Sequence, residues 1–149
     1  MPVADEIGYH LTANTTGQTF GTSLFVNALP DETAGVSTVI VETASFGPQQ
    51  TMGGATLPQW EHARVQVITR STQPLGGSGI ANPTAARTRA QKTWECLTKI
   101  VNQTVGATSV GSRYYLRVEP LQSPFLLDRD NRGRTLFAAN YECWRKVST

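Results

Sequence analysis

Three segments of this chain are rich in β-branched residues or alternate apolar and polar positions, and both patterns require a sheet. Val36–Thr43 (VSTVIVET) is β-branched almost throughout, which predicts a well-buried strand. Trp60–Arg70 and Thr135–Val147 alternate apolar and polar residues, so each predicts a strand with one face toward a core. In the last segment every second residue from Phe137 to Cys143 is apolar, and this series marks the buried face.

Two further strands and one helix extend this layer. Ser23–Leu29 predicts a short strand that Pro30 stops, and Arg113–Glu119 predicts one that forms an antiparallel hairpin with the final strand. A helix begins after Asn82, a fitting N-cap with proline next to it, and we expect Gly106 to stop it. Its apolar stripe consists of Ala86, Ala90, Trp94, Leu97, Ile100 and Val101.

These elements predict an α+β domain with an antiparallel or mixed sheet of about five strands, one main helix and long loops. A chain of 149 residues fits one domain, which we place at residues 21–149. Residues 1–20 are polar and rich in threonine and glycine, so we expect a poorly helical N-terminal arm. The longest predicted loop, Ala44–Pro58, contains the apolar residues Phe46, Met52 and Leu57.

Charge is unevenly distributed along the chain. Residues 1–60 contain five acidic residues and no Lys or Arg, whereas residues 61–149 contain all thirteen basic residues and six acidic ones. The first part therefore has a formal charge of −5 and the second a charge of +7. Three interpretations follow: a self-complementary surface between copies, contact with nucleic acid, or a fold that interleaves the two parts and mixes their charges.

The two cysteines and the N-terminal residues indicate the cellular compartment in which the protein folds. Cys96 and Cys143 form no CxxC pair, and we expect free thiols in a reducing cytoplasm. The residues after Met1 lack the basic start and apolar run of a signal peptide, and no apolar stretch approaches the ~20 residues that span a bilayer. We expect no membrane association.

Chemical motifs are weak throughout. His10 and His62 have no partner at metal-ligand spacing, and the glycines of residues 76–79 lack the lysine of a phosphate loop. Asp128–Gly133 resembles the start of a calcium loop, but Arg132 occupies a ligand position, so a turn is the better interpretation. We expect no cofactor, no metal and no enzymatic activity.

Two runs resemble the bacteriophage tail terminator and minor capsid protein family. The first is GTSLFVNALPD at residues 21–31; the second begins VEP at residue 118, continues PFLLDRD from Pro124 and ends FAANYE at residue 142. The resemblance covers about residues 21–146. It implies a structural virion protein at the head–tail junction: a homohexameric ring that caps the tail tube and joins it to the head-side connector or stopper protein, with DNA passing through its lumen.

A ring needs contacts between unlike surfaces of neighbouring copies. We expect these contacts, and contacts with the tail tube protein, from the Ala44–Pro58 loop and from a basic group near the final turn. The candidate interface residues are Phe46, Met52, Leu57, Trp60, Arg129, Arg132 and Arg134.

Other functions stay open on the sequence. Another head–tail junction protein, such as a tail completion or stopper subunit, and a tail tube subunit fit the same features. Arg113 and the arginines of the final turn, with Tyr114, Tyr115 and Phe137 near them, also fit a small module that binds single-stranded nucleic acid.

Overall fold

The computed structural model describes residues 2–14, 17–31, 35–49, 60–72, 83–107 and 111–147, with residues 45–49 described by their backbone alone. Eight elements follow one another in these ranges. They are α1 (Val3–Ala13), β1 (Leu24–Val26), β2 (Ser37–Gln49), β3 (Trp60–Arg70), α2 (Thr84–Thr98), β4 (Val101–Ala107), β5 (Gly111–Arg129) and β6 (Thr135–Lys146). The strands form one sheet of order β1-β2-β3-β6-β5-β4. Because β1 runs parallel to β2 and the other neighbours are antiparallel, the sheet is mixed and the predicted α+β class is confirmed.

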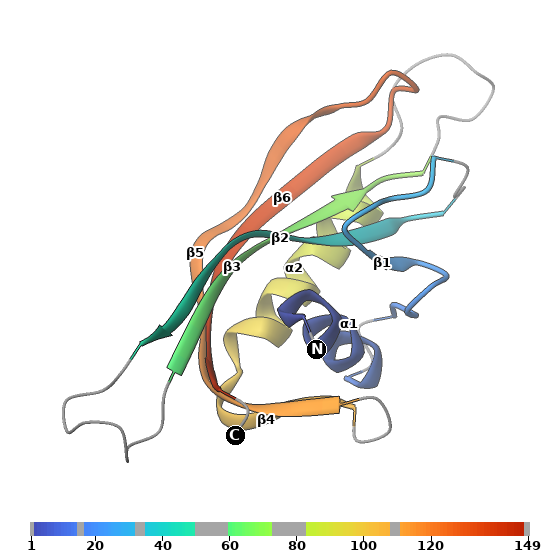
Figure 1. Cartoon of the computed structure of the whole chain (residues 1–149). Coiled ribbons are helices and arrows are strands. Elements are labelled where there is room, and N and C mark those ends of the chain that lie inside the picture. The colour runs from blue at the N-terminus through green and yellow to red at the C-terminus, as the bar shows by residue number, and fades with distance from the viewer. Residues whose placement is uncertain are drawn as a thin grey trace.

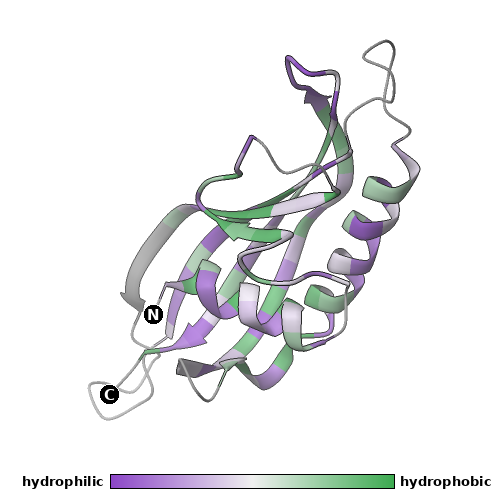
Figure 2. Cartoon of the chain, turned by 90° about the vertical axis from the view of Figure 1, so that its right-hand side faces the viewer, coloured by the Kyte–Doolittle hydropathy of each residue, from purple (hydrophilic) through white to green (hydrophobic). Residues whose placement is uncertain are grey.

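The sheet curls around the two helices, which lie on its inner face (Figure 1). Hydrophilic and hydrophobic residues alternate along the strands (Figure 2), because successive side chains of a strand point to opposite faces. On β3, Ala63, Val65 and Val67 belong to the buried core, as do Ala139, Tyr141 and Cys143 on β6. The buried faces predicted for these two strands are therefore confirmed.

The N-terminal segment is a helix, and the expectation of poorly helical residues there was wrong for Val3–Ala13. Four of its apolar side chains lie in the core: Val3, Ala4, Ile7 and Leu11 are at most 2% exposed. These four residues lie one, three or four positions apart, a spacing that forms one apolar stripe along a helix. Two acidic residues also occupy the first turn, where the helix dipole favours negative charge. Glycine and threonine content around the helix outweighed this signal in the prediction.

Two strands continue through prolines that were expected to end them. The predicted loop from Ala44 to Pro58 is strand β2 as far as Gln49, and β5 continues past Pro120 and Pro124 to Arg129. Proline lacks the N–H that a central strand donates, so it is tolerated where a strand has no neighbour on one side. This condition holds for the described residues: β1 pairs only with Thr38–Ile40 of β2, and β4 pairs only with residues 111–117 of β5.

Helix α2 ends at Thr98, eight residues before the expected stop at Gly106, and the chain then forms the unpredicted strand β4. The apolar stripe had seemed to continue through Ile100 and Val101. In the structure Ile100 is buried in the core, whereas Val101 is 56% exposed and starts β4. Asn102 then takes a positive φ of 48°, a conformation that a helix cannot contain.

In the described part of the chain, no helix is both long and apolar enough to cross a membrane.

Candidate functional site

The seven predicted interface residues are not gathered in one place. Phe46 lies on β2 opposite His62 of β3, and its side chain is outside the described structure, as are Met52 and Leu57 entirely. Trp60 begins β3 and is half-buried, with its ring 6.4 Å from that of Tyr114 on β5. Trp60 and the arginines therefore belong to different parts of the sheet, since the arginines lie at the turn between β5 and β6.

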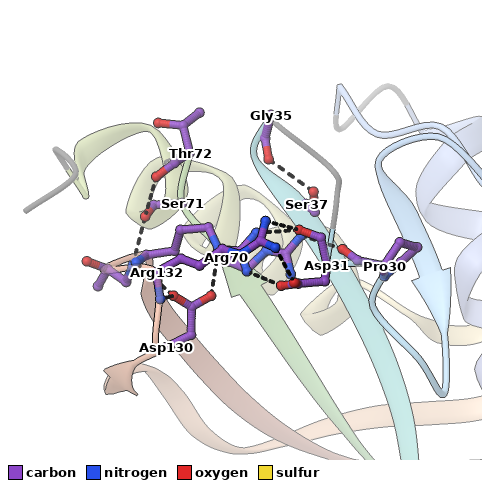
Figure 3. A network of polar contacts seen from close by, with 11 residues as sticks. Pro30, Asp31, Gly35, Ser37, Arg70, Ser71, Thr72, Asp130 and Arg132 are labelled. Atoms are coloured by element: carbon purple, nitrogen blue, oxygen red, sulfur yellow. Dashed lines mark hydrogen bonds and ion pairs between the residues drawn. The ribbon is translucent and has the colours of Figure 1, made fainter. Parts of the chain in front are cut away.

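Arg129 and Arg132 are exposed at that turn, but Arg134 is 1% exposed and lies inside the molecule. The Arg134 guanidinium donates to Asp130 Oδ2 at 2.6 Å and to Asp31 Oδ1 at 2.6 Å. Arg132 Nη2 lies 2.8 Å from the second carboxylate oxygen of Asp31. We call Asp31, Asp130, Arg132 and Arg134 the Asp31 cluster; Figure 3 shows it with its surroundings.

The Asp31 cluster fixes the β5–β6 turn to the loop after β1. Asp130 Oδ1 accepts the backbone N–H groups of Arg132 and Arg134, and Arg70 donates to the carbonyl of Pro30 at 2.7 Å. A hydrogen bond from Arg134 lowers the pKa of Asp31, and the positive charge of Arg132 lowers it further. Burial raises the pKa of Asp130, but hydrogen bonds from Arg134 and Arg132 outweigh it and the net shift is downward. Both carboxylates are thus held ionised.

A second ionic group lies at the other end of the inner face, between α1 and the sheet. Glu6, completely buried, accepts the Tyr115 hydroxyl at 2.5 Å and pairs with Arg145 at 2.9 Å and with Arg113 at 3.7 Å. Both arginines also contact the Glu61 carboxylate. We call these five residues the Glu6 cluster. Burial, more than any neighbouring charge, raises the pKa of Tyr115 well above its usual value, so the phenol stays protonated and donates to Glu6.

For the residues that they contain, the two clusters support the interpretation that the fold interleaves the acidic and the basic part of the chain. Glu6 and Asp31 come from the acidic first part, and the four arginines that pair with them come from the basic second part. These charges are neutralised within one chain. The fold therefore interleaves the two parts of the chain at these residues.

The outer face of the sheet carries no described helix and is crossed by polar contacts. On it, His62 stacks on Trp144 at 4.3 Å between ring centroids and lies 2.9 Å from Glu142. One row along, Gln66 donates to Asn140, whose amide donates to Gln122. These contacts join β3, β6 and β5 side by side on the outer face.

Large exposed apolar residues are concentrated on β5. Leu121, Leu126 and Leu127 are 48%, 58% and 44% exposed, and Tyr114 and Leu116 of the same strand are 41% and 37% exposed. Val101 is the only other large apolar residue with comparable exposure among the described residues. Sequence reasoning missed this group because the prolines had ended the predicted strand at Glu119.

The described ranges contain no cluster of three or more His, Cys, Asp or Glu side chains that could hold a metal ion. One hollow of about 380 Å³ is an open recess between α1, α2 and β4. Burial lowers the pKa of His10 and raises that of Cys96, both of which line it, so the histidine stays neutral and the thiol protonated. Cys143 is fully buried and its pKa is raised by burial, which also disfavours the nucleophilic thiolate.

Exposed large apolar residues concentrated on one strand are typical of a surface that contacts another protein. The family model for the bacteriophage tail terminator protein matches residues 11–146. The chain therefore belongs to the bacteriophage tail terminator family, a family of structural proteins of the phage tail and not a class of enzymes. No curated protein matches the sequence.

Proposed function

We propose that the chain forms a closed homohexameric ring that ends the tail tube and joins it to the head-side connector or stopper protein. The family match supports a place in the virion tail. The observation that carries the ring is the sheet itself: among the described residues, β2 beyond its pairing with β1 and β5 beyond its pairing with β4 have no further strand beside them. Contacts between unlike surfaces of successive copies generate a ring when the rotation closes.

The partners in this proposal are further copies of the chain, the tail tube protein and the head-side connector, with DNA passing through the lumen. The subunits are made and folded in the host cytoplasm and act at the head–tail junction as a minor component of the virion, without a catalytic step. The Asp31 and Glu6 clusters support such a role because each joins distant parts of the chain within one subunit.

Copy number and position distinguish this function from the related ones. Purified protein is added to isolated tail tubes, and the complexes are imaged by electron microscopy with the subunits labelled. A terminator gives one ring at one end of each tube. Labelling along the whole tube would instead identify a tube subunit, and binding to connectors but not to tubes would identify a stopper.

A further inference from the structure

The outer side of β5 is open over most of its length. β4 pairs with residues 111–117 only, and within the described structure no strand pairs with the outer side of Val118–Arg129, which we call the β5 open edge. Figure 1 shows β5 and β6 continuing together, away from β4, over this stretch. An open edge normally attracts further strands, so its chemistry indicates what it is built to meet.

The backbone of the β5 open edge is blunted against simple strand addition. The Val118 N–H donates outward, to the Ile100 carbonyl at 3.0 Å. Residues 118–120 keep a regular register with β6, and alternate residues of a strand direct their backbone groups to the same side. Pro120 therefore faces outward too, where it has no N–H to donate. A continuous intermolecular sheet is disfavoured here, and side chains must provide the contact.

Register shifts in β5 direct leucines outward. The pairing with β6 passes from Pro120 to Gln122 and from Leu126 to Asp128, so Leu121 and Leu127 have no opposite residue. Such bulges turn a side chain away from its regular direction. Between Val118 and Leu127 the only charged residue is Glu119. Exposed edges are usually protected by charge, so a leucine-rich edge indicates a surface that is covered in the assembled state.

The opposite end of the sheet has a compatible character. There Phe25 and Val26 of β1 are half-buried, and Glu42 is the only charged residue of β1 and β2. The β5 open edge has three charged residues, Glu119 near its start and Asp128 and Arg129 at its end, so charges are few at both ends of the sheet. The twelve residues of the β5 open edge span about 40 Å, long enough to supply the roughly 800 Å² per partner that a stable interface needs.

We propose that the leucines of the β5 open edge, Leu121, Leu126 and Leu127, pack against the β1–β2 end of the next copy of this chain. This contact rests on the proposed ring and names the surfaces that build it. Each subunit gives its leucine edge to one neighbour and receives another neighbour's edge at β1 and β2, which is a heterologous contact.

The test replaces leucines and measures assembly by native mass and analytical ultracentrifugation. L121Q/L126Q/L127Q is expected to shift the protein from ring to folded monomer, since each leucine removed weakens association roughly fivefold to tenfold. The matched control is Leu116→Gln, because Leu116 is also skipped by the register and 37% exposed but lies where β4 covers β5. The control is expected to form rings like the unchanged chain. If the triple variant does not fold, by circular dichroism, Leu126→Gln alone is used.

The remaining outcomes separate this contact from the ring. Rings of normal mass and stability from the triple variant overturn the contact and leave the ring intact. Rings that form normally but no longer attach to tail tubes also overturn it, and assign the leucines to the tube. An unchanged chain that remains a monomer at every concentration overturns the contact and the proposed function together.

Discussion

The Glu6 cluster and the Asp31 cluster use the same chemistry at opposite ends of the sheet, with opposite patterns of burial. Each joins one carboxylate of residues 1–60 to two arginines of the later chain. In the Glu6 cluster the carboxylate is completely buried; in the Asp31 cluster the carboxylate is 59% exposed and Arg134 is the buried partner. Because breaking an ion pair is costly when a buried charge is left alone, we expect the loss of stability to depend on which partner is removed.

The largest effect is expected from Glu6→Ala, which removes a carboxylate from beside Arg145 and Arg113 and removes the acceptor of the Tyr115 hydroxyl. We expect the free energy of unfolding to fall by about 3–5 kcal/mol. Urea unfolding followed by tryptophan fluorescence measures it. Glu6→Gln is the matched control, because it keeps an acceptor for Tyr115 and removes only the charge. Equal stability of the alanine variant and the unchanged chain would show that the cluster contributes nothing to the fold.

The next effect compares the two arginines that contact Asp31. Arg134→Met removes a buried guanidinium that bonds to Asp31 and Asp130, and should cost about 2 kcal/mol. Arg132→Met removes a guanidinium whose side chain is 44% exposed, and should cost at most about 1 kcal/mol. Thermal unfolding of the two variants side by side provides the comparison. The reverse order would contradict the role assigned to burial.

A smaller loss is expected from Tyr115→Phe. It removes one hydrogen bond to a charged group while keeping the ring in the core, so the free energy of unfolding should fall by about 1–2 kcal/mol. In the Glu6→Gln background the same change should cost less, because a neutral amide is a weaker acceptor than a carboxylate. A double-mutant cycle measures this coupling. Purely additive losses would mean that the phenol and the carboxylate act independently.

The smallest effect concerns pH. The pKa values of Asp31 and Asp130 are lowered from 3.8 in the folded chain. The unfolded chain therefore binds protons first, and the stability that the Asp31 cluster contributes is present above about pH 4 and is lost as the pH falls further. Thermal unfolding at a series of pH values, with Asp31→Asn beside the unchanged chain, should show a shallower acid slope in the variant. Parallel slopes would mean that Asp31 has the same pKa in both states.

The two clusters also mark the limit of what the sequence could predict. The strand Trp60–Arg70 was predicted with its observed bounds because alternation is a local signal. Pairing of Asp31 with Arg134, and of Glu6 with Arg145, joins residues more than a hundred positions apart, and no local pattern encodes it. Arg134 appeared as one of several exposed arginines, and only the folded chain shows that it is buried while Arg129 is not.

The failure to predict α1, β4 and the full length of β5 also has physical causes. Helix α1 had a readable apolar stripe from Val3 to Leu11, which composition obscured. Strand β4 depends on pairing with β5, and the long β5 depends on an edge position that tolerates Pro120 and Pro124. Leu126 and Leu127 were part of the resemblance, in the run PFLLDRD, but their place on an open edge required the register with β6.

The central claim is that the chain forms a ring at the end of the tail tube. Its most direct test is the native mass of the protein, alone and after addition of tail tubes. We expect a ring of six chains that forms from folded monomers and then attaches to tube ends. A folded chain that remains solitary at high concentration, and that tubes do not recruit, would contradict the account.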